Sequence, residues 1–135
     1  MEAPTIIFDL LGEDVTKDMD ADELLHRYAA GERSFREAEL NASDLREVNL
    51  KGADLSYSDL SDADLSYANF RGTDLSYANL VNANLTAADF RGAILIGTDF
   101  RGAILETANL QEADYNEATR YPDGFDPAKA GLRKK

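Results

Sequence analysis

Cysteine and tryptophan are missing from this chain of 135 residues, and histidine occurs once, at His26. Without cysteine the chain has no disulfide, no thiolate ligand for zinc and no thiol nucleophile. A single histidine cannot form a multi-histidine metal site, and we expect His26 to lie on the exposed side of a helix rather than to act as a catalytic base. These absences predict a protein that is not an enzyme, with no catalytic residue, no metal and no cofactor.

Basic residues are also scarce, because 14 Lys and Arg stand against 26 Asp and Glu, which gives a formal net charge of -12. Affinity for DNA or RNA depends largely on cations that neutralise phosphates, so we expect no direct nucleic-acid binding. No apolar run is long enough to cross a bilayer, and residues 1–15 lack the basic start and the apolar stretch of a secretory signal. The expectation is therefore a cytoplasmic protein that does not enter a membrane.

What the chain does contain is a period of five residues. A large apolar residue recurs at every fifth position over seventeen repeats without a gap. These residues are Phe35, Leu40, Leu45, Leu50, Leu55, Leu60, Leu65, Phe70, Leu75, Leu80, Leu85, Phe90, Leu95, Phe100, Leu105, Leu110 and Tyr115. Two residues before each of them stands a small residue, with Arg33 as the exception, and the residue between the two is usually Asp or Asn.

A period of five fits neither the helical period of 3.6 nor the strand period of 2. Residues two apart lie on the same side of an extended segment, so the small residue and the Leu or Phe both point inward. The next small residue comes three positions later and would point outward unless the backbone turned in between. One turn in every repeat winds the chain into a coil, and stacked coils bury the residues at their centre. We therefore predict an all-β solenoid.

Several strings in this region resemble a known motif: A-D-L-S-Y at 53–57 and 63–67, A-N-L at 78–80, and A-D-F-R-G at 88–92. They are similar to the A(D/N)LXX motif of the pentapeptide-repeat family. The resemblance implies a right-handed quadrilateral β-helix with four repeats in each coil, hence a superperiod of 20 residues and about four coils. The sequence departs from the motif at Ile94 and Ile104, where the usual outward Asp or Asn is apolar.

Three segments follow from this pattern: an N-terminal arm with a short capping helix at 1–32, the β-helix at 33–117, and a C-terminal cap and tail at 118–135. Such caps are expected because a solenoid exposes unpaired backbone at both ends. Asp20 is the candidate N-cap of the helix and Gly31 its terminator.

Both flanks are similar to those of small pentapeptide proteins of photosynthetic bacteria. Pro122 and Pro127 end the regular pairing, and we expect the last coil to be covered by Tyr121, Phe125 and Leu132. The apolar residues between Ile6 and Leu11 have more than one possible role, either as a strand or helix against the tower or in self-association.

Neither the carboxylates nor the glycines form a recognisable chemical site. The Asp and Glu residues occupy outward repeat positions in a row, without the ligand loop of an EF-hand, and we interpret them as a solvated polar wall. The R-G pairs at 71–72, 91–92 and 101–102 lie at corners instead of opening a helix, so they do not match a phosphate-binding loop. Glycine at a corner eases the bend.

Two surface features remain as candidates for protein contact. Lys51, Arg71 and Arg91 are 20 residues apart and are predicted to stack on one wall, where pairing with neighbours such as Asp89 is the simpler interpretation. Tyr57 and Tyr77 are predicted to stack on another wall. The second feature is an apolar group in a polar surface, made of Ile94, Ile96 and Ile104. It is typical of a contact site, although contact with the tail or the N-terminal arm would satisfy it equally.

The sequence therefore favours a non-catalytic scaffold or protein-binding module with an unidentified protein partner. The alternative, from the resemblance, is an acidic DNA mimic, because some members of the family occupy the DNA site of type II topoisomerases such as DNA gyrase. The net charge fits this alternative, but a tower about 20 Å tall matches only about six base pairs. The expected state is a monomer or an end-to-end dimer, and only the dimer would lengthen the mimic.

Overall fold

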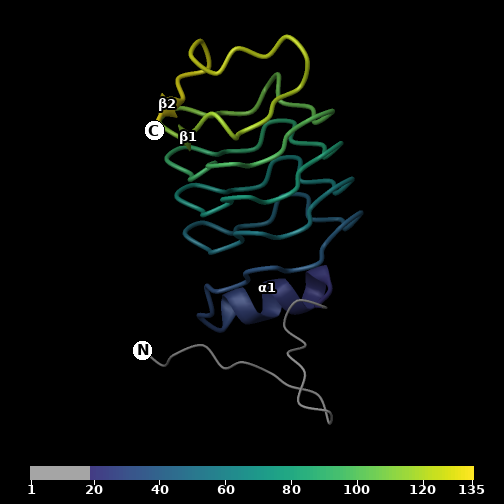
Figure 1. Ribbon diagram of the computed structural model, residues 1–135. Helices are drawn as coiled ribbons and strands as arrows, with labels where there is room; N and C mark the ends of the chain where they lie inside the picture. The colour runs from purple at the N-terminus through teal and green to yellow at the C-terminus, as the bar shows by residue number, and fades with distance from the viewer. Residues whose placement is uncertain (1–18) are drawn as a thin grey trace.

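The computed structural model describes residues 19–135 as a stack of coils with a helix at one end (Figure 1). Its regular elements in that range are the helix α1 at Ala21–Ala29 and two short parallel strands, β1 at Asp114–Tyr115 and β2 at Arg133–Lys134. The coils between α1 and β1 are joined by isolated parallel bridges. No helix within this range is both long and apolar enough to cross a membrane.

All the isolated bridges except Asp99 with Arg120 join residues twenty positions apart, so the chain returns to the same place after four repeats. They form four ladders, which we call A to D. Ladder A holds Ser34, Asp54, Asp74, Ile94 and Asp114, and ladder B holds Glu39, Asp59, Asn79, Asp99 and Arg120. Ladder C holds Asp44, Asp64, Asn84 and Ile104, and ladder D holds Asn49, Asn69, Asp89 and Asn109. Residues ten apart, half a winding, therefore lie on different ladders.

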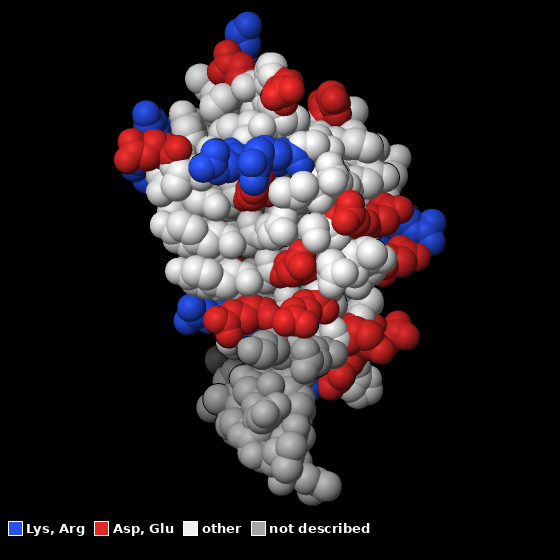
Figure 2. All heavy atoms as spheres, turned by 45° about the vertical axis from the view of Figure 1, so that its right-hand side comes forward, with Lys and Arg blue, Asp and Glu red and all other residues white. Residues whose placement is uncertain are grey.

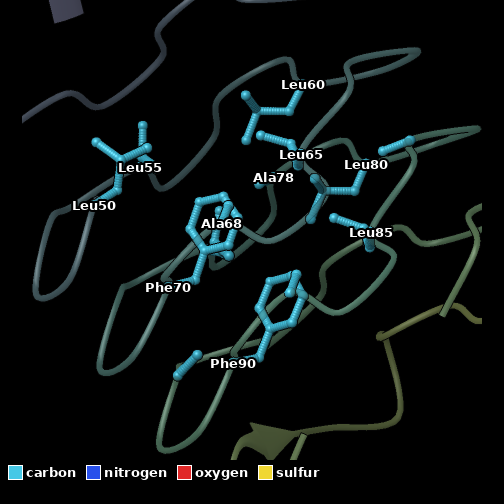
Figure 3. Close-up of a cluster of buried hydrophobic side chains, with 14 of the residues drawn as sticks. Leu50, Leu55, Leu60, Leu65, Ala68, Phe70, Ala78, Leu80, Leu85 and Phe90 are labelled. Carbon is cyan, nitrogen blue, oxygen red and sulfur yellow. The ribbon is translucent and has the colours of Figure 1, made fainter. Parts of the chain in front are cut away.

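The predicted inward residues form one continuous core. The Leu and Phe residues between Phe35 and Leu110 are buried, as are most of the small residues that precede them (Figure 3). Phe70 and Phe90 stack with ring centroids 5.1 Å apart, and Phe100 meets Phe90 edge to face at 6.1 Å. Each such side chain contributes about 1.5–3 kcal/mol by leaving water. The core is thus a column of repeated contacts along the solenoid axis.

Polar residues at the small inward position are also accommodated. The hydroxyls of Ser58, Thr73 and Thr98 each donate to a backbone carbonyl of the preceding coil, at 3.2, 2.8 and 2.8 Å. Because these buried hydroxyls are hydrogen-bonded, they carry no desolvation penalty of the kind that an unpaired group would. Ser or Thr can therefore replace Ala in the repeat without opening the core.

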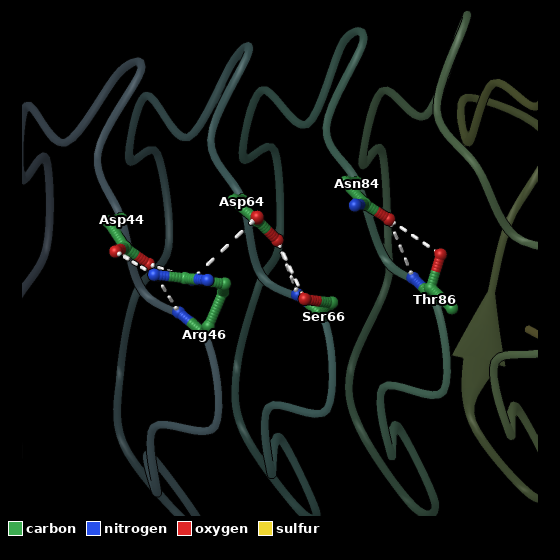
Figure 4. A network of polar contacts seen from close by, with 6 residues as sticks. All are labelled: Asp44, Arg46, Asp64, Ser66, Asn84 and Thr86. Atoms are coloured by element: carbon green, nitrogen blue, oxygen red, sulfur yellow. Dashed lines mark hydrogen bonds and ion pairs between the residues drawn. The ribbon is translucent and has the colours of Figure 1, made fainter.

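The outward Asp or Asn of each repeat stabilises the corner that follows it. Its side-chain oxygen accepts the backbone N–H two residues later, as Asp64 does from Ser66 at 3.1 Å and Asn84 from Thr86 at 3.2 Å (Figure 4). The hydroxyl of Ser66 donates to the same Asp64 oxygen at 2.8 Å. This local bond is the one that Asp and Asn favour in turns. The repeated Asp and Asn are therefore explained by backbone geometry.

At most corners the second residue after the Leu or Phe has a left-handed backbone. Gly52 adopts a φ of 72° there, and Tyr57 adopts 62° without the conformational freedom of glycine. Thr107 occupies the same position but does not adopt a positive φ, because a β-branched residue is strongly disfavoured in that region. Its hydroxyl instead accepts the N–H of Ala87 from the coil below, at 3.0 Å, so the ladder continues through a side chain.

At the N-terminal end, α1 lies against the first coil (Figure 1). The Asp20 side chain accepts the N–H of Glu23 at 2.9 Å, which confirms the predicted N-cap. Leu24 and Met19 are buried in the same core cluster as Phe35. His26 is exposed, as predicted. The apolar residues Ile6 to Leu11, for which the sequence left alternatives open, lie outside the described residues.

At the C-terminal end the regular spacing is broken by one residue, since Arg120 pairs with Asp99 at an offset of 21. Tyr121 stacks on Phe100 and on Phe125, with ring centroids 6.1 and 4.9 Å apart. Leu132 is buried in the core cluster and leads into β2, which pairs with β1. The Tyr121 hydroxyl is buried without a hydrogen-bond partner in the described part of the chain, and burial raises the pKa of Tyr121 well above its usual value.

Replacing Phe90 with alanine is expected to lower the free energy of unfolding by about 3–5 kcal/mol, because the change leaves a cavity beside the Phe70 ring. Urea denaturation followed by circular dichroism measures the difference. Tyr67→Ala is the control, because that side chain is 64% exposed and its removal should change stability by no more than about 0.5 kcal/mol. Equal losses in the two variants would show that the phenylalanine column is not the main source of stability.

Tyr121→Phe is expected to keep or raise stability by about 1 kcal/mol, because it removes an unpaired buried hydroxyl. The pKa of this group is higher in the folded state than the usual value of about 10, so the wild-type protein should lose stability as the pH rises above about 10. Urea denaturation between neutral pH and about pH 11 should show a shallower loss in Tyr121→Phe. Identical pH dependence in both proteins would contradict the assignment.

Candidate interaction surface

The carboxylates of the repeats do not assemble into a chemical centre. In residues 19–135, no group of three or more His, Cys, Asp or Glu side chains is placed to hold a metal ion. Asp44, like Asp89 and Asp99, is bound by the Arg two residues later, and its carboxylate accepts two bonds of 2.8 Å from the Arg46 guanidinium (Figure 4). These bonds lower the pKa of Asp44 to about 2. Hydrogen bonds from the following Arg likewise lower the pKa of Asp89 and of Asp99, so these three carboxylates are held as anions in local pairs.

An apolar group lies on and beside ladder A. We call Tyr57, Tyr77, Ile94 and Ile96 the apolar face A. The two tyrosine rings are stacked with centroids 5.4 Å apart and an interplanar angle of 17°, which confirms the predicted stacking. Each ring is about half exposed, at 51% and 49%, and Ile94 is 37% exposed. Ile96 is partly buried. Apolar side chains that stay in water on a rigid surface are candidates for contact with another molecule.

The ends of the tyrosine stack are closed by the chain itself. The Arg36 guanidinium lies 5.3 Å from the centre of the Tyr57 ring. At the other end the Tyr77 ring covers Gly97, where a Cβ atom would collide with the ring. The rings are therefore held in place from both sides and present their edges to solvent. A pre-positioned aromatic edge loses little conformational entropy when a partner binds.

The three isoleucines do not form one cluster. Ile94 lies in ladder A, with Ile96 two residues further along, whereas Ile104 lies in ladder C, half a winding away. Ile104 is 47% exposed and is bridged to Asn84. The sequence analysis grouped them because all three are apolar residues in an otherwise polar surface. The 20-residue superperiod already separated positions 94 and 104, and it also placed the two tyrosines beside Ile94, a grouping that the sequence analysis missed.

Lys51, Arg71 and Arg91 form a basic column at the corner between ladders D and A. The N–H of Gly52 donates to the carbonyl of Arg71 at 3.0 Å, and the N–H of Gly72 to that of Arg91 at 3.1 Å, so successive coils stack at this corner. Arg91 pairs with Asp89 at 2.6 Å, as the simpler interpretation predicted. Hydrogen bonds from Arg91 lower the pKa of Asp89. Lys51 and Arg71 make no ion pair within residues 19–135.

Charge is distributed unevenly over the molecule (Figure 2). On the side shown there, acidic and basic groups lie next to one another in several clusters that are separated by uncharged areas, and most of the visible Lys and Arg lie in the half nearer the C-terminal end. Arg101 pairs with Asp99 at 2.6 Å, and Arg120 is bridged to the same Asp99. The net charge of -12 therefore does not describe each part of the surface.

Comparison with known proteins identifies relatives over most of the chain. The family model for pentapeptide repeats (8 copies) matches residues 34–72 and 68–106. The solved structure of alr5209, a pentapeptide repeat protein from Nostoc PCC 7120, is 47% identical, with a TM-score of 0.85 over 87% of this chain and 98% of that protein. Among curated proteins, the search finds no match.

Two further solved structures are similar over shorter lengths. HetL from Nostoc sp. strain PCC 7120, which is involved in the regulation of heterocyst differentiation, is 36% identical over 75% of this chain, with a TM-score of 0.57. The chain spans 46% of HetL. A pentapeptide repeat protein from the thylakoid lumen of Arabidopsis thaliana is 31% identical over 61% of this chain and 60% of its own length, with a TM-score of 0.55.

Proposed function

The chain belongs to the pentapeptide-repeat family and folds as a right-handed β-helix, and from that premise we propose that it is a non-catalytic scaffold that binds another protein through the apolar face A. The exposure of Tyr57, Tyr77 and Ile94 on one side of a rigid solenoid carries the proposal. Tyrosine is enriched at the energetic centres of protein interfaces. The stack is already ordered, so a partner gains contact area without ordering these side chains.

We also propose the finer architecture of the scaffold. It is a quadrilateral β-helix of about four coils, in which α1 is the N-terminal cap and residues 118–135 form the C-terminal cap. The 20-residue bridges support the four-sided coil, and the burial of Leu24 and Met19 beside Phe35 supports the capping role of α1. A scaffold closed at both ends leaves its sides as the surfaces for binding.

The partner should be captured from a native cell extract by the intact protein and lost with Ile94→Asp. The matched control is Ile104→Asp, which makes the same chemical change at the same repeat position of a different ladder. Both changes restore the Asp that the repeat motif carries at this position, so both variants should fold. Tyr77→Ser is a second variant in the apolar face A. Retained proteins are identified by mass spectrometry.

We expect the intact protein and Ile104→Asp to retain the same protein, and Ile94→Asp and Tyr77→Ser to retain little of it. If the intact protein and all three variants retain the partner, binding takes place at another surface. If Ile104→Asp also fails to retain the protein, then ladder C takes part in binding, or any exposed apolar residue contributes wherever it lies. Circular dichroism and urea denaturation verify that each variant is folded.

An acidic DNA mimic is the second candidate, and the observation that favours it is the run of acids in ladders A, B and C, such as Asp54 with Asp74 and Asp44 with Asp64. The basic column at Lys51, Arg71 and Arg91 counts against it, because a mimic of DNA presents negative charge. The monomer is also short, so this role requires an end-to-end dimer. The mimic is the less favoured candidate.

Supercoiling of a relaxed plasmid by DNA gyrase should be unchanged by an excess of the protein if it is not a DNA mimic. The assay is run across a range of protein concentrations, with a matched amount of an unrelated acidic protein as the control. Inhibition that follows the concentration of this protein, and that is absent with the control, would favour the mimic over the scaffold.

A further inference from the structure

The outward residues of ladder D differ from those of the other three ladders. Asn49, Asn69 and Asn109 are neutral, and Asp89 is the single carboxylate. Its charge is offset by Arg91, which lies 2.6 Å away. Ladders A, B and C each hold at least two carboxylates at the corresponding positions. Ladder D is therefore the side of the coil on which acids are scarcest.

The asparagines of ladder D leave hydrogen-bond donors available. Each uses its side-chain oxygen to accept the backbone N–H two residues later, from Lys51 at 3.1 Å, Arg71 at 3.0 Å and Gln111 at 3.1 Å. The remaining group of each side chain is an NH₂, which only donates, and none of the three donates a hydrogen bond within residues 19–135. Ladder D thus presents three amide donors on successive coils, with Asp89 between those of Asn69 and Asn109.

The basic column lies directly beside these donors. Lys51, Arg71 and Arg91 are exposed, and Gly52, Gly72 and Gly92 follow them with nothing within 4 Å of where a Cβ would be. No side chain projects from these glycines, so the surface of the corner beside the cations is open. A shallow cavity of about 370 Å³ lies at its upper end, lined by Arg71, Arg91, Gly92, Gln111 and Glu112.

We propose that the ladder D surface, made of Asn49, Asn69, Asn109, Lys51, Arg71 and Arg91, binds an acidic α-helix of a partner protein that lies along the solenoid axis. Carboxylates accept hydrogen bonds from both the amides and the cations of this surface. Lys51 and Arg71 make no ion pair in the described residues, and Arg71 acts on Asp89 only at longer range. Three cations, Lys51, Arg71 and Arg91, stand here against two acids, Asp89 and Glu112. Because screening confines charge effects to about 8 Å at physiological ionic strength, this local excess outweighs the acids of the other ladders.

The spacing of the coils favours a helix as the occupant. Stacked strands are about 4.8 Å apart, and one turn of an α-helix rises about 5.4 Å. A helix parallel to the axis therefore places roughly one side chain per turn opposite each coil. Across three coils, the difference between the rise of the helix and the spacing of the coils adds up to only about 1 Å. An extended strand places side chains of one face about 6.8 Å apart and falls out of register sooner.

This surface differs in residues and in chemistry from the apolar face A, so the proposal goes beyond the proposed function and does not depend on it. A nucleic acid is the less favoured occupant, because a long polyanion would extend past the basic column onto the acidic ladders. A helix with one acidic row meets only the column and the amides.

The test is a titration of the full chain with a synthetic helical peptide, followed by the amide chemical shifts in NMR spectra. The peptide has about 18 residues, or five turns, and is alanine-rich with Glu at every third or fourth position, so that the acids form one row. A peptide of the same composition with Glu spread around the helix is the first control. A single-stranded DNA oligonucleotide of equal charge is the second.

We expect the row peptide to shift amides at positions 49–52, 69–72 and 89–92, and to bind about tenfold more weakly to the Lys51→Gln, Arg71→Gln double variant. The matched control is Arg46→Gln, Arg101→Gln, which removes two exposed cations from the same repeat position on other sides of the coil. That variant should bind within about twofold of the wild type.

Four results would overturn the proposal. They are shifts centred on another ladder, equal weakening in both double variants, equal binding of the spread peptide, or tighter binding of the oligonucleotide. The first two would show that the surface is not specific, the third that a helical row is not recognised, and the fourth that the surface suits a nucleic acid. None of these results bears on the apolar face A, which the extract experiment tests separately.

Discussion

The structure depends on a corner that recurs after every fifth residue. At that corner a backbone N–H bonds to the side chain of the outward Asp or Asn, and the next residue takes a positive φ. Where both conditions hold, they turn the chain in the same way, and the Leu or Phe returns to the centre. The repeats of Ile94 and Ile104 lack the side-chain acceptor, yet Leu95 and Leu105 are buried as well. The core is a result of this regular turning, because inward side chains that share the same angle on successive coils stack on one another, as Phe70 does on Phe90.

The same regularity decides what the surface is able to do. Outward side chains are placed in columns, and each column repeats one chemical character unless a residue departs from the pattern. Most of the Asp residues of the four ladders are accounted for by their bonds to the backbone of the corner, as Asp64 shows. The residues left over are the informative ones: the tyrosines and isoleucines of the apolar face A, and the cations beside ladder D. The net charge of the whole chain identifies neither surface.

Much of this arrangement was predictable from the sequence, because a period of five leaves few solutions. The inward residues and the N-cap at Asp20 followed from spacing and local propensity. The stacking of Tyr57 on Tyr77 also needed the 20-residue superperiod that the family resemblance implies. Two departures from the regular repeat were not predictable. Nothing in the sequence marks the extra residue that pairs Arg120 with Asp99. Nothing marks the use of the Thr107 hydroxyl, in place of a backbone carbonyl, as a hydrogen-bond acceptor. Both depend on how one coil meets the next.

The candidate site was only partly predictable for the same reason. An apolar residue in an outward position can be recognised singly, but its neighbours lie 20 residues away and not beside it in the chain. Ile94 and Ile104 look alike in sequence and lie on different ladders, whereas Ile94 and Tyr77 look unrelated and belong to one side of the coil. Grouping residues by their position within the 20-residue winding assigns Ile94 to the side of Tyr77 and Ile104 to a different side.

The 20-residue spacing of the bridges also determines which changes of length the molecule can absorb. Duplication of twenty consecutive residues within the repeats would add one complete winding and lengthen every column without mixing them. Insertion of a single repeat would preserve the core, since every Leu or Phe would still point inward. It would, however, move each outward residue after the insertion to the next ladder. The tyrosine stack would then lose its partner and the basic column would be divided. In this family, a lineage can therefore change its binding surfaces by gaining or losing five residues while its fold stays intact.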